Sequence, residues 1–209
     1  MPNYVYLVRH GETEFNNKEI MHGQYDVPLN QLGIKQAKLL GLELRDVHFD
    51  VCFCSPLSRA KDTAKEIMKY HTDVPVIYDD RLMEIYMGNL ENTTNHPPNY
   101  MLDEELELLK KHDFESHAHF FTRVKSLLDE ITDEYVNKDI LIVAHCGTVR
   151  MSMIYFDPPN VCIEDMYYDL KIKNCSVQRV LNNKPERSPI LVTYDVSKED
   201  WPNIALYED

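Results

Sequence analysis

The stretch Tyr4-Val5-Tyr6-Leu7-Val8-Arg9-His10-Gly11-Glu12-Thr13 joins an apolar run to a charged turn with no polar spacer between them. Residues 4–8 have the composition of a buried β-strand. A strand that ends in Arg9 and His10 carries a cation and an imidazole to the edge of a sheet, where open α/β folds bind their ligands. The stretch therefore predicts an α/β fold with an anion-binding site at a strand end.

Strand and helix patterns alternate along the rest of the chain. Strands are expected at 50–54, 74–78, 140–144, 176–181 and 190–196, and helices at 30–47, 55–68, 114–135 and from 148 onward. The unbroken apolar run at 140–144 is typical of a parallel strand that is covered on both faces. We therefore expect a three-layer, doubly wound, mostly parallel sheet with helices on both faces, and an antiparallel hairpin formed by the last two strands.

The 209 residues are enough for one substantial core, and we expect a single domain over 1–209. A polar stretch and a brief helical pattern predict an insertion or lid at 89–113. No apolar run is long enough to cross a bilayer. The first strand begins so close to Met1 that we expect no signal peptide, a cytoplasmic protein and no membrane partner.

The formal net charge of -13 argues against a nucleic-acid partner, because it repels phosphodiester backbones. The five cysteines are scattered, without the CxxC spacing of a zinc site or a redox pair. His112, His117 and His119 lie close together, but their spacing lacks the i, i+4 pair with which a helix binds zinc. We therefore expect no metal and no cofactor. The sequence carries no signal for an oligomeric state.

Two further cationic or imidazole side chains are expected at the edge of the sheet that carries Arg9 and His10. Ser55 and the proline after it predict the start of a helix with Ser55 as its N-cap, which places Arg59 in the first turn. The strand at 140–144 ends in His145. Arginines bind phosphate oxygens with paired hydrogen bonds, and an imidazole can form a covalent intermediate. Together these residues predict a phosphate site with a candidate nucleophile.

Several segments resemble those of the histidine phosphatases, also called phosphoglycerate-mutase-like proteins. Residues 7–13 with Asn16 match the LVRHGETxxN signature, and residues 55–64 match SPLxRAxxTA. Residues 26–37 resemble the DxPLTxxGxxQA region, Leu82-Met83-Glu84 the acid-bearing turn, and Val143-Ala144-His145 the second histidine motif. The matches follow the family's order from residue 7 to residue 147.

The resemblance implies a phosphoglycerate-mutase-like fold and a role for each matching residue. The catalytic residues would be His10, the nucleophile that becomes phosphorylated, Glu84, the general acid, and His145. Phosphoryl oxygens would be held by His145 together with Arg9, Arg59, Asn16 and the backbone N–H of Gly23. Cys146 departs from the glycine or small residue that the family usually has there.

Three functions fit these residues. The first is a metal-independent phosphatase that hydrolyses a small phosphorylated metabolite, and we favour it. The second is a phosphoglycerate mutase, but that branch of the family follows its acid with Arg-His-Tyr-Gly and carries a later arginine pair. Here Ile85-Tyr86-Met87-Gly88 follows Glu84, and the chain has no Arg-Arg pair. The third is a non-catalytic protein that binds a phosphorylated ligand, which the full set of catalytic residues disfavours.

Overall fold

The structure is a computed structural model that describes residues 1–94, 110–156, 172–181 and 190–194. Its described part contains a six-stranded sheet in the order β3-β2-β4-β1-β5-β6. The strands are β1 (Tyr4–Arg9), β2 (Val51–Cys54), β3 (Val76–Tyr78), β4 (Asp139–Ala144), β5 (Val177–Leu181) and β6 (Ile190–Tyr194). The first four are parallel, β5 is antiparallel to β1, and β6 is antiparallel to β5. The expected mostly parallel sheet with a late antiparallel hairpin is confirmed.

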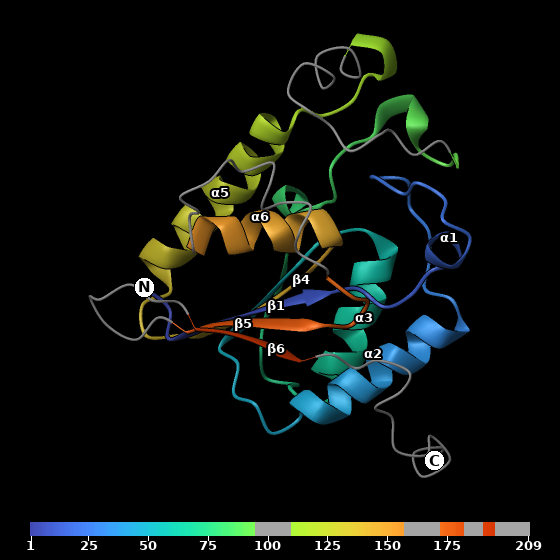
Figure 1. The fold of residues 1–209 in the computed structure, drawn as a ribbon. Coiled ribbons are helices and arrows are strands. Elements are labelled where there is room, and N and C mark those ends of the chain that lie inside the picture. The colour runs from blue at the N-terminus through green and yellow to red at the C-terminus, as the bar shows by residue number, and fades with distance from the viewer. Residues whose placement is uncertain (95–109, 157–171, 182–189, 195–209) are drawn as a thin grey trace.

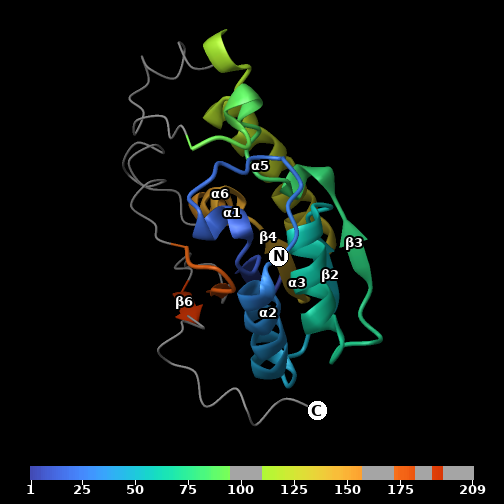
Figure 2. The same ribbon diagram turned by 90° about the vertical axis from the view of Figure 1, so that its right-hand side faces the viewer.

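Helices cover both faces of the sheet, as Figures 1 and 2 show. They are α1 (Glu14–Asn17), α2 (Gln31–Leu44), α3 (Ser58–Met68), α5 (His117–Glu134) and α6 (Cys146–Phe156), with the 3-10 turns η1 (Asp80–Leu82) and η2 (Gly88–Leu90). The pair α2 and α3 packs together on one face, and the pair α5 and α6 packs on the other. The three-layer prediction is therefore confirmed.

The apolar run of β1 is buried because alternate side chains enter two different cores. Val5 and Leu7 pack in the core that includes Leu128 of α5. Tyr6 and Val8 pack in the core on the opposite face, among side chains of α2 and α3. The strand β4 divides its side chains in the same way. A strand that contributes to two cores reads as continuously apolar, which is the pattern that predicted it.

The chain reverses its winding direction between the neighbouring strands β1 and β4. The segment after β1 leads to α2 on one face, whereas the segment after β4 leads directly to α6 on the other. The backbone N–H of His10 donates to the carbonyl of Ala144 at 3.0 Å, so the two strand ends lie side by side. Open α/β sheets form their ligand crevice at such a point.

The predicted start of α3 was wrong by two residues, because its N-cap is Leu57 and not Ser55. The helix begins at Ser58, and Leu57 makes no side-chain capping hydrogen bond. The hydroxyl of Ser55 lies 2.7 Å from Nε2 of His145 and accepts from the N–H of Leu57 at 3.4 Å. Asp26 supplies the capping acceptor from a distant loop, since its Oδ1 accepts from both the N–H and the hydroxyl of Ser58 at 2.8 Å.

The segment between β1 and α2 contains the short helix α1. Thr13 and Asn16 form a capping box at its start, in which each side chain accepts from the other residue's backbone N–H. Most of the insertion predicted at 89–113 lies outside the described residues. Within the described ranges, no helix has the length and apolar character needed to cross a membrane.

Candidate active site

Three neighbouring strand ends bring the predicted residues together. His10 follows β1, His145 follows β4, and Ser55 follows β2, where its N–H donates to the carbonyl of Val143. The rings of His10 and His145 lie 5.1 Å apart, measured between their centroids. Arg59, in the first turn of α3, is completely buried beside them. The local sequence order, with a polar residue directly after each strand, produces this cluster.

A cavity of about 160 Å³ opens at this edge of the sheet. Its walls include six of the seven predicted site residues, namely Arg9, His10, Asn16, Gly23, Arg59 and Glu84, together with His22 and Cys146. The seventh, His145, is fully buried and is not part of the wall. The structure therefore places His145 behind His10 and Arg59 rather than at the cavity surface.

His10 is oriented as a nucleophile requires. Its Nδ1 lies 2.7 Å from the carbonyl oxygen of Gly11. Because a carbonyl can only accept, Nδ1 carries the proton and Nε2 carries the lone pair. Burial, followed by the charges of Arg59 and Arg9, holds the pKa of His10 well below its usual value. The ring is therefore neutral near pH 7, and its Nε2 is free to attack an electrophile.

Both ring nitrogens of His145 are engaged. The guanidinium of Arg59 can only donate, so its Nε–H donates to Nδ1 of His145 at 3.2 Å. The Nε2–H then donates to the hydroxyl of Ser55 at 2.7 Å. Burial, with the charge of Arg59 next in weight, lowers the pKa of His145 well below normal. These contacts fix the ring and its tautomer.

The two arginines give the cavity its positive charge. Arg59 also donates to the backbone carbonyls of Gly23 and Tyr25, at 2.8 and 3.0 Å. Burial lowers the pKa of Arg59 to about 10, so it remains charged near neutral pH. Arg9 donates through Nη1 to the carbonyl of Ile172, but its buried Nε–H has no acceptor among the described residues. A buried donor of this kind suits an anionic ligand.

Asn16 is held so that its amide nitrogen is available to a ligand. Its Oδ1 accepts from the N–H of Thr13 at 3.1 Å and from Nδ2 of Asn174 at 3.2 Å. Asn174 also donates to the carbonyl of His10 at 3.0 Å, and it therefore links both cavity residues. The sequence pattern did not single out Asn174, because a side chain that contacts backbone carbonyls follows no periodicity.

Gly23 is required by its surroundings. Its φ of +52° is in the left-handed region, and a Cβ at this position would lie 2.1 Å from Oε1 of Glu91. The neighbouring His22, a third histidine in the cavity that the sequence did not assign, lies beside Thr13 with Nε2 within hydrogen-bond distance of its Oγ1. Burial, with Arg59 and Arg9, lowers the pKa of His22 to about 3, so its ring is neutral.

Glu84 is the only carboxylate among the predicted site residues, and it is 9% exposed at the cavity wall. Its Oε1 accepts from the N–H of Ile85, and its Oε2 accepts from the N–H of Gly147, both at 3.0 Å. The carboxyl group of Glu84, which can carry a proton, thus lies at the same cavity as the neutral imidazole of His10. The guanidinium groups of the two arginines lie there as well. Such a set can displace a group from phosphorus and protonate it.

The three histidines that lie close together in the sequence, at 112–119, have different surroundings in the structure. His117 is buried, whereas His119 is exposed and contacts Glu115, and His112 contacts Asn89. Within the described part of the chain, no group of three or more His, Cys, Asp or Glu side chains could hold a metal ion.

Comparison with known proteins gives a consistent family. The model of the histidine phosphatase superfamily (branch 1) matches residues 5–193. The uncharacterized phosphatase PhoE of Bacillus subtilis is 36% identical over 153 residues, which cover 70% of this chain and 73% of that protein. Phosphoserine phosphatase 1 of Hydrogenobacter thermophilus is 36% identical over 156 residues, covering 71% and 72%.

Solved structures show the same fold. A phosphoserine phosphatase mutant of Entamoeba histolytica, in complex with phosphoserine, superposes with a TM-score of 0.73 at 26% identity. The match covers 91% of this chain and 95% of that one. A phosphoglycerate mutase of Bacillus anthracis also gives a TM-score of 0.73, at 22% identity and with 91% and 92% covered.

Proposed function

Because the chain belongs to the histidine phosphatase superfamily (branch 1), and its relatives are phosphatases, we propose that it hydrolyses small phosphorylated metabolites through a phosphohistidine at His10, without metal or cofactor. The observation that carries the proposal is the hydrogen bond from Nδ1 of His10 to Gly11, which leaves the Nε2 lone pair in a cavity containing two arginines. Arg9 and Arg59 stabilise the charge on the transferring phosphoryl group.

In the first step, Nε2 of His10 attacks phosphorus and the bond from phosphorus to the leaving oxygen breaks. Glu84, in its protonated form, gives its proton to that oxygen, and the alcohol departs. In the second step, water attacks phosphorus while the Glu84 carboxylate takes a proton from it. The bond from phosphorus to Nε2 breaks, inorganic phosphate is released, and both side chains return to their starting forms.

The remaining residues hold the phosphoryl oxygens. The Nε–H of Arg9, the amide of Asn16 and the backbone N–H of Gly23 are donors at the cavity. His145 lies behind this surface, where its Nδ1 accepts from the Nε–H of Arg59 and so orients that guanidinium for the phosphoryl group.

The test is hydrolysis of p-nitrophenyl phosphate by wild type and by His10→Ala, each with and without a chelator. We expect H10A to lose at least about a thousandfold in kcat, since it removes the covalent route, and the chelator to have no effect. Brief incubation followed by denaturing mass spectrometry should detect an added phosphoryl group on wild type. His117→Ala, which removes a histidine outside the cavity, should retain that group. Undiminished activity in H10A would rule out the phosphohistidine.

A panel of phosphorylated metabolites identifies the substrate, and it begins with phosphoserine because two similar proteins are named for its hydrolysis. The same panel tests the alternative of a phosphoglycerate mutase. A mutase would interconvert phosphoglycerates faster than it releases phosphate. No release from any phosphomonoester, together with tight binding of inorganic phosphate, would instead indicate a non-catalytic binding protein.

A further inference from the structure

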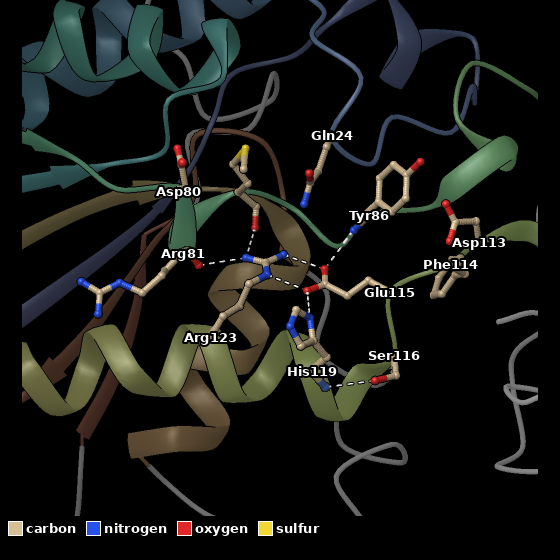
Figure 3. Close-up of a pocket in the computed structure, with 11 residues that line it drawn as sticks. Gln24, Asp80, Arg81, Tyr86, Asp113, Phe114, Glu115, Ser116, His119 and Arg123 are labelled. Carbon is tan, nitrogen blue, oxygen red and sulfur yellow. Dashed lines mark hydrogen bonds and ion pairs between the residues drawn. The ribbon is translucent and has the colours of Figure 1, made fainter.

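A larger cavity, of about 630 Å³, lies against the chain segment that carries Glu84 (Figure 3). Its lining includes Arg81 and Met83, which precede Glu84, and Tyr86, which follows it. Glu115 and Arg123 project from the opposite side, Arg123 from α5 and Glu115 from the segment just before that helix. The two sides meet at a network of hydrogen bonds.

Arg123 uses all five of its N–H donors in this network. Its Nη1 donates to the carbonyls of Arg81 and Met83 at 2.9 and 2.7 Å, and its Nη2 donates to the carbonyl of Glu84 at 2.8 Å. The remaining two donors, on Nε and Nη2, bind the two carboxylate oxygens of Glu115 at 2.7 and 2.8 Å. One guanidinium therefore fixes three carbonyls of a single segment.

Glu115 binds the backbone of the same segment on the other side of Glu84, at Tyr86. Its Oε2 accepts from the N–H of Tyr86 at 3.0 Å, and its own N–H donates to the carbonyl of Tyr86 at 2.8 Å. The pair is largely shielded, with side-chain exposures of 7% for Glu115 and 15% for Arg123. Hydrogen bonds between charged partners in such surroundings are strong and directional.

The segment needs this support because regular secondary structure does not fix it. Residues 83–87 lie between the short turns η1 and η2, outside every strand of the sheet. Thr148 binds the carbonyls of Leu82 and Met83, and Gln24 binds that of Glu84, but each of these is a neutral contact. Arg123 is the charged donor that reaches the carbonyl of Glu84 itself.

We propose that Arg123, oriented by Glu115, is a positioning residue that holds the backbone on both sides of Glu84 so that its carboxyl group remains at the catalytic cavity. The proposal rests on the function proposed above, in which Glu84 is the proton donor. A displacement of the carboxyl group impairs proton transfer, because general acid catalysis depends on hydrogen-bond geometry. It leaves Arg9, Arg59 and His10 in place, because they belong to other elements.

The experiment compares two substrates that differ in their need for a proton. The p-nitrophenolate of p-nitrophenyl phosphate leaves as a stable anion, whereas the alcohol of an alkyl phosphate must be protonated as it leaves. We expect Arg123→Met to reduce kcat/KM by about tenfold or more for the best alkyl phosphate of the panel, but less than about threefold for p-nitrophenyl phosphate, because kcat/KM reports the departure of the leaving group and not the hydrolysis of the phosphohistidine that both substrates share. The inhibition constant of inorganic phosphate should stay unchanged.

Further variants separate positioning from general stability. Arg123→Lys keeps the charge but has three donors in place of the planar five, so we expect only partial recovery of the alkyl phosphate rate. Glu130→Gln is the matched control, because Glu130 of α5 pairs with Arg81 at 2.8 Å without contacting Glu84. It should not alter the ratio of the two rates. If R123M does not fold, Glu115→Gln provides the same comparison, and thermal unfolding monitors all variants.

Glu84→Gln tests the acid role of Glu84 and the positioning role of Arg123 together. It should show the same dependence on the leaving group, and the double variant E84Q/R123M should be no slower than E84Q alone. Equal losses of kcat/KM for both substrates in E84Q would overturn the acid role of Glu84 and this proposal with it. A dependence on the leaving group in E84Q that R123M does not share, or additive losses in the double variant, would overturn the role of Arg123 alone.

Discussion

His145 is held at both nitrogens, and Ser55 provides one of those contacts from the end of β2. The hydroxyl of Ser55 therefore contacts the site, and it also accepts from the N–H of Leu57, the N-cap of α3, at 3.4 Å. The backbone N–H of Ser58, at the start of α3, is satisfied by Asp26. A short polar residue after a strand can therefore orient a buried imidazole while a distant residue supplies the cap.

Ser55→Ala should lower kcat/KM by about tenfold, because it leaves the buried Nε2–H of His145 without an acceptor, at a cost of about 1–3 kcal/mol. Steady-state kinetics with p-nitrophenyl phosphate measures the change. Ser58→Ala removes a hydroxyl in the same segment that binds Asp26 and not His145, so its kcat/KM should remain close to wild type. Equal effects of the two substitutions would contradict this role for Ser55.

At the residue scale, the sequence predicted the side chains that follow strands. Arg9, His10 and Arg59 reach the cavity as expected, because strand ends determine where those side chains emerge. Residues that act through backbone carbonyls were not predicted. Asn174 and Arg123 bind carbonyls of segments far away in the chain, and such contacts leave no periodic or motif signal in the sequence.

At the scale of elements, the start of α2 lies directly against the turn after β1. A Cβ on Gly33 would come within 2.0 Å of the carbonyl oxygen of Glu12, and one on Gly11 within 2.6 Å of that of Gly33. The N–H of Glu12 donates to Gln36 of the same helix at 2.7 Å. The helix thereby fixes the backbone next to His10, which explains why the Gly-x-x-Gln pattern accompanies the histidine.

Gly33→Ala should destabilise the protein by about 1–3 kcal/mol, because one of two backbone segments must shift to admit the methyl group. It should also reduce kcat, since the shifted turn carries His10. Gly41→Ala provides the control in the same helix. Its Cβ would lie 2.6 Å from the carbonyl of Glu66, where α2 packs on α3, so it should lower stability with little effect on kcat. Urea unfolding measures stability and steady-state kinetics measures kcat. A normal kcat in G33A would show that the start of α2 does not hold the turn that carries His10.

The helices and strands themselves were largely predictable, because their apolar periodicities are strong. Their ends were less so, since local competition determines them. The start of α3 lies at Ser58, where Asp26 from a distant loop accepts from the backbone N–H. The capping box of Thr13 and Asn16 accompanies a helical turn in a short segment that has no apolar periodicity. The order of the strands also has no local signal, because it depends on which faces the helices cover.

At the scale of the molecule, the site keeps three histidines uncharged. Burial and the two arginines lower the pKa values of His10, His22 and His145. An unfolded chain protonates these rings as the pH falls through about 6.5, whereas the folded protein does not protonate His22 until about pH 3. Because the unfolded state then binds more protons, acid favours unfolding below pH 6.5.

The free energy of unfolding should therefore decrease between pH 6.5 and pH 5, with His22 alone contributing about 2 kcal/mol. Urea unfolding at both pH values measures the decrease. The glutamine of His22→Gln cannot be protonated. The decrease in its free energy of unfolding between the two pH values should therefore be smaller than that of wild type by about 2 kcal/mol. If the free energy of unfolding of His22→Gln decreased with falling pH as steeply as that of wild type, His22 would have to be protonated in the folded protein as well.

The position of β1 in the sheet affects how the protein folds during its synthesis. Both neighbours of β1, β4 and β5, follow it by well over a hundred residues. A ribosome thus completes an apolar strand long before either of its partners exists, and contacts of such long sequence separation form slowly. The nascent chain must keep this strand from aggregating until residue 144 has emerged. His10, the proposed nucleophile at its end, is therefore among the first residues of the site to be synthesised and reaches its final surroundings only after β4 has formed.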